Sequence, residues 1–229
     1  MDNKKFLIIN NGRCGSTYLA SILNNLKKFR VELNDTINII DLFNKLETYD
    51  KKNSKNNLFI GAKVLFHYFQ TEFDKTKLHD YCYIYLKRRN EFNTAISNIT
   101  TSYRIKKGFF ANYTISDNKN FTSLKYHNLD RNLIIQHYFN RIGADIITVE
   151  FFKKHKLNYV EIYYEDLCSN KFETIQKITK FLNYNLNIDL DDLKTEYIKI
   201  LDYNKILKNN EVLGAKEILK KRYSIKIIE

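Results

Sequence analysis

The sequence lacks proline and tryptophan altogether, and its 229 residues include only six glycines, three cysteines and one methionine. Cys14, Cys82 and Cys168 are odd in number and have no paired spacing. We therefore expect free thiols in a reducing cytoplasm rather than a disulfide framework. No cluster of histidine and cysteine has the spacing of metal ligands, so no metal is expected.

Long apolar runs are also missing. No window approaches the roughly 18 uninterrupted apolar residues of a membrane-spanning helix, and the N-terminal "MDNKKFLIIN" does not resemble a signal peptide. Hydrophobic residues make up 44% and aromatic residues 14% of the chain, which is enough to form one sizeable core. We expect a single domain over residues 1–229, with a core at about 5–185 and a helical C-terminal tail at about 189–229.

The net charge is +12, but only 8 of the 38 basic residues are arginine. A basic balance suits an anionic partner. The charge is also explained by a compositional drift toward Lys, Asn, Ile, Tyr and Phe. Such a drift is typical of an AT-rich genome, as in a low-GC bacterium or a virus. We therefore infer no specific nucleic-acid binding from the charge. The same drift makes each arginine more informative than each lysine.

Apolar patterning alternates between short strands and amphipathic helices. Residues 49–57 are expected to form a surface loop, residues 32–43 a loop and then a helix, and residues 108–128 a lid or loop. The alternation predicts an α/β fold, a P-loop-like three-layer sandwich with a central mostly parallel sheet flanked by helices. Strands are predicted at 6–10, 58–65, 81–86 and 159–164, and helices at 16–28, 91–106, 129–155 and 171–182.

The first predicted strand runs into a glycine-containing loop, Asn11–Gly15, and then into a helix from Ser16. The G-x-x-x-x-G-K-[ST] pattern of nucleotide-hydrolysing loops fails, because its lysine is absent and its spacing differs. The dinucleotide pattern G-x-G-x-x-G fails as well. Neither common nucleotide motif fits this loop.

The loop still has the features of an oxyanion site. Amides at a helix N-terminus carry partial positive charge, Gly15 permits close approach of the backbone, and Ser16 and Thr17 add hydroxyl donors. Arg13 supplies a planar, permanently charged fork. The loop suits a phosphate or sulfate held without a metal. The alternative is an ordinary strand-to-helix turn with Gly15 and a serine cap.

A second strand-to-helix segment, Tyr85–Asn98, carries Arg88 and Arg89 at the end of its strand. Ser97 lies eight residues after Arg89, almost two turns into a helix that starts near Glu91. Arg89 and Ser97 are therefore candidates to clamp one phosphate. The alternative is a surface arginine pair before a helix whose serine has no function.

These two segments, in this order, resemble the sulfotransferases that use 3'-phosphoadenosine-5'-phosphosulfate (PAPS). Arg13–Leu19 matches their R-x-G-S-[ST]-x-L motif, and Arg89 with Ser97 matches their second motif. The chain is most similar to the bacterial trehalose 2-sulfotransferase group, which shows a G-x-K segment, as in Gly61–Lys63, and a Tyr-Glu-Asp-Leu segment, as in Tyr164–Leu167.

The resemblance runs from about residue 6 to residue 182, with departures. Cys14 replaces the usual Ser or Thr, and the tryptophans typical of the group are absent, with Phe66 a candidate to stand in for one of them. The resemblance implies a small-molecule or glycan acceptor whose hydroxyl is sulfated, as in a carbohydrate or glycolipid. It leaves the particular acceptor and the oligomeric state, a homodimer included, open.

The resemblance also implies roles for the site residues. Arg13, Cys14, Gly15, Ser16 and Thr17 would surround the 5'-phosphosulfate of PAPS, the sulfuryl donor. Arg89 and Ser97 would select its 3'-phosphate. Transfer would be in-line and metal-independent, resting on positioning and charge neutralisation.

The acceptor hydroxyl needs a base. Glu32, nineteen residues after Arg13, is the first candidate by resemblance, and His67 is the second. The alternatives are a solvent-facing carboxylate and a core histidine. Lys63 would touch the transferring sulfate, or be a surface lysine at a strand end.

Three further expectations concern residues around these motifs. Glu165 and Asp166 are expected to cap the following helix and orient the loops. Lys220–Arg222 would reach the 3'-phosphate or be a solvated helix end. Cys14 is a candidate reactive thiol.

Two other function classes remain open from sequence alone. A nucleotide or sugar kinase with a degenerate P-loop predicts dependence on ATP and Mg²⁺. A basic nucleic-acid-binding protein predicts salt-sensitive binding to any DNA. A sulfotransferase fold that only binds its ligand is a third possibility.

Overall fold

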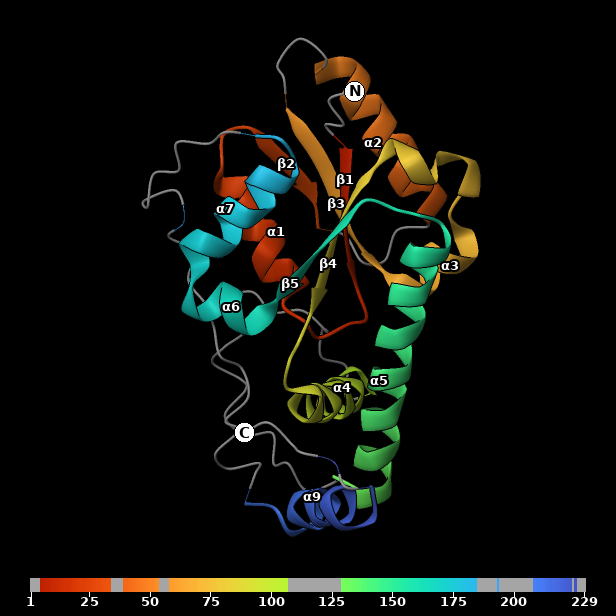
Figure 1. Ribbon diagram of the computed structural model, residues 1–229, viewed down its shortest axis with the longest axis vertical. Coiled ribbons are helices and arrows are strands. Elements are labelled where there is room, and N and C mark those ends of the chain that lie inside the picture. The colour runs from red at the N-terminus through yellow and green to blue at the C-terminus, as the bar shows by residue number, and fades with distance from the viewer. Residues whose placement is uncertain are drawn as a thin grey trace. The chain divides into compact units, whose positions relative to one another are not determined.

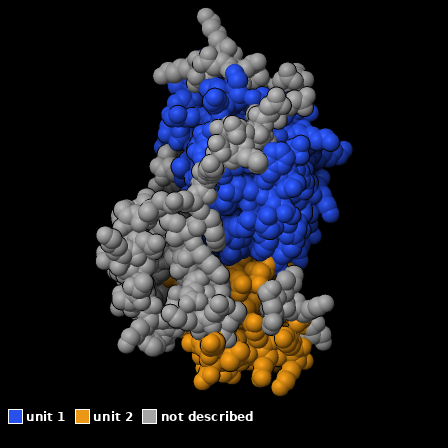
Figure 2. All heavy atoms as spheres, turned by 90° about the vertical axis from the view of Figure 1, so that its left-hand side faces the viewer, with its two compact units in different colours: residues 1–89, 145–196 blue, residues 90–144, 197–229 orange. Residues whose placement is uncertain are grey.

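The computed structural model describes residues 5–33, 39–53, 58–106, 129–184, 193, 208–223 and 225 (Figure 1). The chain forms two compact units, residues 1–89 with 145–196 and residues 90–144 with 197–229, which Figure 2 distinguishes by colour. The single domain expected from the sequence stays a prediction.

The first unit contains a five-stranded sheet in the order β2-β3-β1-β4-β5, in which every neighbouring pair is parallel (Figure 1). Its central strand β1 is buried on both faces, as strands covered by helices on each side must be. The predicted α/β fold with a mostly parallel sheet is thereby confirmed. The strands are β1 (Lys5–Asn10), β2 (Phe29–Glu32), β3 (Phe59–Leu65), β4 (Cys82–Lys87) and β5 (Tyr159–Tyr163).

Helices cover both faces of this sheet and make it a three-layer sandwich. Successive side chains of β1 point to opposite faces of the sheet and pack into two separate cores. Phe6 and Ile8 lie in one core, and Leu7 and Ile9 lie in the other. The first core is closed by α1 (Ser16–Asn25), α6 (Tyr164–Ser169) and α7 (Lys171–Phe181). The second is closed by α2 (Ile39–Asn53), α3 (Phe66–Glu72), the 3-10 helix η2 (Lys75–Asp80) and the C-terminal part of α5 (Arg131–Lys154).

The second unit is helical in its described part. It contains α4 (Glu91–Lys106), the N-terminal part of α5 and α9 (Asn210–Tyr223), packed around a core that includes Phe92, Ile134 and Val212. Asn90 caps α4, because its side-chain oxygen accepts a hydrogen bond from the backbone N–H of Asn93 at 2.9 Å. The helix therefore begins at the residue that the sequence pattern predicts.

Four elements escaped the sequence analysis: β2, α3, η2 and α6. Strand β2 has only four residues, and a side chain from another element fixes it: Asn24 in α1 accepts from Val31 N–H at 2.6 Å and donates to Val31 C=O at 2.8 Å. The loop expected at 49–57 is partly wrong, because α2 extends through Asn53. The lid or loop at 108–128 and most of the tail from 189 lie outside the described residues.

None of the helices in the described part of the chain combines the length and the apolar character needed to cross a bilayer.

Candidate functional site

The loop between β1 and α1 has an unusual backbone. Gly12, Arg13 and Gly15 all have positive φ, at 84°, 55° and 78°. For Arg13 this left-handed conformation costs on the order of 1–2 kcal/mol, so its surroundings must hold it there. The Asn10 side chain helps, because it accepts from Gly12 N–H at 2.9 Å and donates to Val64 C=O at 3.3 Å. Backbone turns of this kind direct consecutive N–H groups toward one point and form anion-binding concavities.

Gly15 stands at the N-cap position of α1 and has no side chain with which to cap it. The amides of the first turn are therefore left for another acceptor. Gly15 also lies against α6: a Cβ added at this position would be 2.3 Å from Cδ2 of Tyr164. No other residue fits without displacing that ring, so the glycine is required both by its φ and by this contact.

Cys14 points away from the loop. Its side chain is 0% exposed in the core beneath α1, and its Sγ donates to the carbonyl of Gly12 at 3.1 Å. The expectation of a reactive thiol is wrong for this conformation, because an alkylating reagent needs access to the sulfur. Only the backbone of Cys14 is available to an anion in the loop.

Lys63 is the least expected residue of the site. It is 2% exposed in the middle of β3, which contradicts the alternative of a surface lysine at a strand end. It pairs in register with Ile8, so its side chain lies on the face of the sheet that α1 covers. Its Nζ donates to Oγ1 of Thr17 at 2.9 Å, which places a buried ammonium directly under the first turn of α1.

The end of β4 lies against α6. The guanidinium of Arg88 lies 4.3 Å from the ring centroid of Tyr164, and that of Arg89 lies 4.2 Å from the ring centroid of Tyr163. Arg89 also donates from Nη1 and Nη2 to the two carboxylate oxygens of Asp166, at 2.6 and 2.7 Å. These hydrogen bonds hold the pKa of Asp166 below its ordinary value and raise that of Arg89.

The expectation that Glu165 and Asp166 cap the helix is wrong, because the N-cap of α6 is Tyr163 and no side chain caps it. Both carboxylates instead contact Arg89 after β4. Asp166 holds the Arg89 side chain, and Glu165 accepts from the backbone N–H of Arg89 at 3.0 Å. Ser97, the other half of the predicted clamp, lies in α4 of the second unit and is 4% exposed. The clamp by Arg89 and Ser97 stays a prediction.

The two candidate bases stand in different settings. Glu32 ends β2 and accepts from Nζ of Lys45 at 2.8 Å, with its side chain 13% exposed. It pairs in register with Ala62, so it lies on the opposite face of the sheet from Lys63. His67 is exposed in the first turn of α3, directly after β3, with its ring 3.8 Å from that of Tyr68. The alternative of a core histidine is therefore wrong.

A polar network that the sequence analysis missed anchors the start of the loop. The Asn11 amide donates to Asp145 at 2.7 Å and to Thr148 at 3.1 Å, both in α5. The hydroxyl of Tyr85, which is buried in β4, donates to the same Asp145 oxygen at 2.6 Å. No local pattern signals this network, because its members lie up to 137 residues apart.

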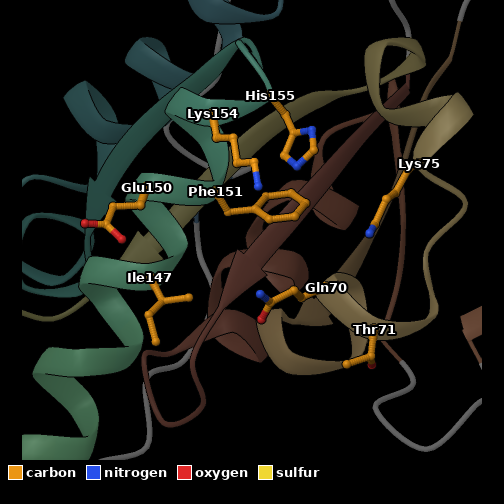
Figure 3. A pocket seen from close by; sticks show the side chains of 8 residues that line it. All are labelled: Gln70, Thr71, Lys75, Ile147, Glu150, Phe151, Lys154 and His155. Carbon is orange, nitrogen blue, oxygen red and sulfur yellow. The ribbon is translucent and has the colours of Figure 1, made fainter.

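A cavity of about 620 Å³ opens in the first unit between α3 and η2 on one side and the C-terminal part of α5 on the other (Figure 3). The ring of His155 lies tilted by 43° to that of Phe151, with 4.4 Å between their centroids. Neither Lys75 nor Lys154 forms an ion pair with any residue of the described part of the chain. The cavity is lined by Gln70, Thr71, Lys75, Ile147, Glu150, Phe151, Lys154 and His155.

Three lining residues are close in sequence to residues of the site. Ile147 is the sequence neighbour of Thr148, whose hydroxyl accepts from Asn11. Gln70 and Thr71 lie three and four residues after His67, on the same face of α3. His67 and Thr148 are not themselves among the lining residues.

Within the described ranges, no three His, Cys, Asp or Glu side chains are grouped as metal ligands. Independence from metal stays a prediction. Lys220–Arg222, the basic residues considered for the 3'-phosphate, are exposed at the end of α9 in the second unit.

Comparison with known proteins places the chain in a family. The family model described as "Sulfotransferase domain" matches residues 3–227, whereas no curated protein sequence matches significantly. Mouse sulfotransferase SULT7A1, solved in complex with PAP, is similar in fold, with 16% identity and a TM-score of 0.55 over 98% of this chain and 86% of that one. The sulfotransferase domain from the Curacin biosynthetic pathway gives 13% identity and a TM-score of 0.49 over 94% and 90%. Since the family match spans nearly every residue, this chain belongs to the sulfotransferase domain family, and it is an enzyme of sulfuryl transfer.

Proposed function

We propose that this enzyme transfers the sulfuryl group of PAPS to a hydroxyl of a carbohydrate or glycolipid, by in-line displacement without a metal. The observation that carries the proposal is the strained loop from Gly12 to Gly15 with the buried ammonium of Lys63 beneath it. An ammonium held beside an anion-binding loop suits a sulfuryl group in transfer, whose negative charge is spread over three oxygens.

The donor would lie along the carboxyl edge of the sheet. The amides at the start of α1, the hydroxyls of Ser16 and Thr17 and the guanidinium of Arg13 would hold the 5'-phosphosulfate. Cys14 would contribute its backbone N–H only, because its side chain is buried. Arg89, with Ser97 as its predicted partner, would bind the 3'-phosphate that distinguishes PAPS from ordinary nucleotides.

In sulfuryl transfer the protein mainly positions the reactants and stabilises negative charge. As the bond between sulfur and the bridging oxygen breaks, negative charge develops on the departing phosphate, where Arg13 and the loop amides would stabilise it. Lys63, whose Nζ donates to Oγ1 of Thr17, would neutralise the equatorial sulfuryl oxygens. These donors are held in place before the reaction, so little reorganisation accompanies it.

The cavity between α3 and α5 supports a carbohydrate as acceptor. Its lining combines amide, hydroxyl, carboxylate and ammonium groups with the rings of Phe151 and His155. Sugars need this combination, because they present many hydroxyls around apolar ring faces. Its residues Gln70 and Ile147 are close in sequence to His67 and Thr148, so a bound saccharide would extend from the cavity toward the loop.

We propose His67 as the base in preference to Glu32. Its imidazole is exposed in the first turn of α3, directly after β3, and histidine is the side chain that most often serves as a general base. The carboxylate of Glu32 is engaged by Lys45 and lies on the opposite face of the sheet from Lys63.

Calorimetry tests the donor site. We expect adenosine 3',5'-bisphosphate, the desulfated product, to bind in EDTA at least about tenfold more tightly than 5'-AMP, a difference of about 1.4 kcal/mol. Arg89→Ala should abolish that difference. Arg30→Ala is the matched control, because Arg30 also lies over a tyrosine ring, that of Tyr49, at 5.5 Å, and should leave the difference intact.

A metal requirement, or equal affinity for the two nucleotides, would contradict the proposal and favour a kinase-like activity. Once donor binding is established, sulfate transfer from PAPS to a panel of oligosaccharides, glycolipids and simple phenols tests the acceptor. Glu150→Gln should slow transfer to saccharides and leave adenosine 3',5'-bisphosphate binding unchanged. If the enzyme prefers phenols and Glu150→Gln does not change that preference, the cavity is not a saccharide site.

A further inference from the structure

The first turn of α6 is built around one side chain at the end of β4. The carboxylate of Asp166 takes two hydrogen bonds from the guanidinium of Arg89, and the Tyr163 ring lies beneath it at 4.2 Å. Glu165 takes the backbone N–H of the same residue at 3.0 Å. Asp166 and Tyr163 therefore fix the direction and the plane of one guanidinium, and Glu165 holds the backbone of the same residue.

This arrangement leaves the arginine able to bind a second anion. A guanidinium has five N–H groups, and the paired bonds to Asp166 use two of them. The other three form no hydrogen bond with any residue of the described part of the chain. The side chains of Arg89 and Asp166 are each 41% exposed, so a ligand in solution can reach the unused donors.

We propose that Asp166 is a positioning residue that makes the nucleotide site selective for a phosphate on the 3'-hydroxyl over one on the 2'-hydroxyl. The inference rests on the proposed function, in which Arg89 binds the 3'-phosphate of the donor. Asp166 does not touch the ligand. It holds the guanidinium in one orientation, and only a phosphate on the correct ribose oxygen meets the N–H groups at its open edge, Nε–H with one Nη–H.

The physical reason lies in the freedom of an arginine side chain. An unrestrained arginine can follow a phosphate to either ribose position, because its long stem has many rotamers of similar energy. Held from one side by a carboxylate and from below by a ring, it cannot follow. The carboxylate thus converts a general attraction for phosphate into recognition of one regioisomer.

The experiment compares adenosine 3',5'-bisphosphate with adenosine 2',5'-bisphosphate by calorimetry in the full-length protein. The two isomers have the same charge and the same atoms, so any repulsion between Asp166 and phosphate acts on both and cancels in the ratio of their Kd values. In the wild type we expect a ratio of about tenfold or more in favour of the 3'-isomer. Asp166→Asn should reduce the ratio to that of Arg89→Ala.

Two further variants separate positioning from simpler effects. Asp50→Asn removes a carboxylate from another exposed ion pair, with Lys5 at 3.0 Å, and should keep the wild-type ratio. Asp166→Glu restores the carboxylate on a longer stem and should raise the ratio above that of the asparagine variant. Exposed ion pairs contribute little to stability, so all of these variants should fold, and their melting temperatures verify this.

A wild-type ratio in Asp166→Asn would overturn the inference, and so would a wild type that binds both isomers equally while still preferring them to 5'-AMP. In either case the donor site itself would stand. A wild type that binds neither bisphosphate would instead refute the proposed function, and the inference with it.

Discussion

Replacing Gly15 by alanine tests the contact at the centre of the site. Gly15 has φ 78° and ψ 23°, and a Cβ there would be 2.3 Å from Cδ2 and 2.6 Å from Cε2 of Tyr164. The left-handed conformation costs an L-residue about 1–2 kcal/mol. Pushing a methyl group into a packed ring costs about 1–3 kcal/mol more. We therefore expect Gly15→Ala to lower the free energy of unfolding by about 2–5 kcal/mol, a large part of the stability of a typical domain.

Urea unfolding, followed by circular dichroism, measures this change. The control is Gly143→Ala, which lies within α5 and whose added Cβ would meet nothing within 4 Å. That variant should be stabilised by about 0.5–1 kcal/mol, because alanine loses less backbone entropy in a helix. The same substitution is thus expected to have opposite signs at two glycines of one chain.

Binding provides a second measurement on the same variant. The ring that Gly15→Ala displaces lies under the guanidinium of Arg88, at the end of the strand that carries Arg89. We expect the affinity for adenosine 3',5'-bisphosphate to fall about tenfold or more, or about 1.4 kcal/mol. A Gly15→Ala protein as stable as the wild type, with unchanged affinity, would refute our account of the loop.

Four further predictions follow from individual side chains. Lys63→Met should lower kcat about 10²–10³-fold, the usual cost of losing one donor to a developing charge, and an unchanged kcat would place Lys63 outside the reaction. His67→Gln should lower kcat about 10²-fold or more with Glu32→Gln nearly neutral, and the opposite result in initial-rate assays would assign the base to Glu32. Iodoacetamide should label only Cys168 in the native protein, increasingly fast above pH 9 because burial raises the pKa of this thiol, and mass spectrometry that finds a second labelled cysteine would contradict the buried positions of the others. The pKa of Asp166 is depressed, so the preference for the 3'-isomer should be constant above about pH 4 and fall only as the carboxylate protonates below that value; calorimetry that shows a loss between pH 5 and 8 would exclude this group.

Much of the fold could be predicted because its signals are local. The strands at 58–65 and 81–86 are short apolar runs whose character does not depend on their neighbours. Helix α4 has the predicted bounds, since Asn90 supplies its cap within the same segment. Strand β2 was missed because its four residues become a strand only when they pair with β3 and with the Asn24 side chain.

The sequence by itself determined the loop after β1 and the arginine at the end of β4, since each motif lies within one strand-to-helix segment. Only the tertiary structure decided what these motifs touch. It places the Cys14 side chain in the core. It buries Lys63 under Thr17, 46 residues away in sequence, and pairs Arg89 with Asp166, 77 residues away. The order and register of parallel strands set such partnerships, because they decide which side chains share a face of the sheet and which strand ends lie side by side.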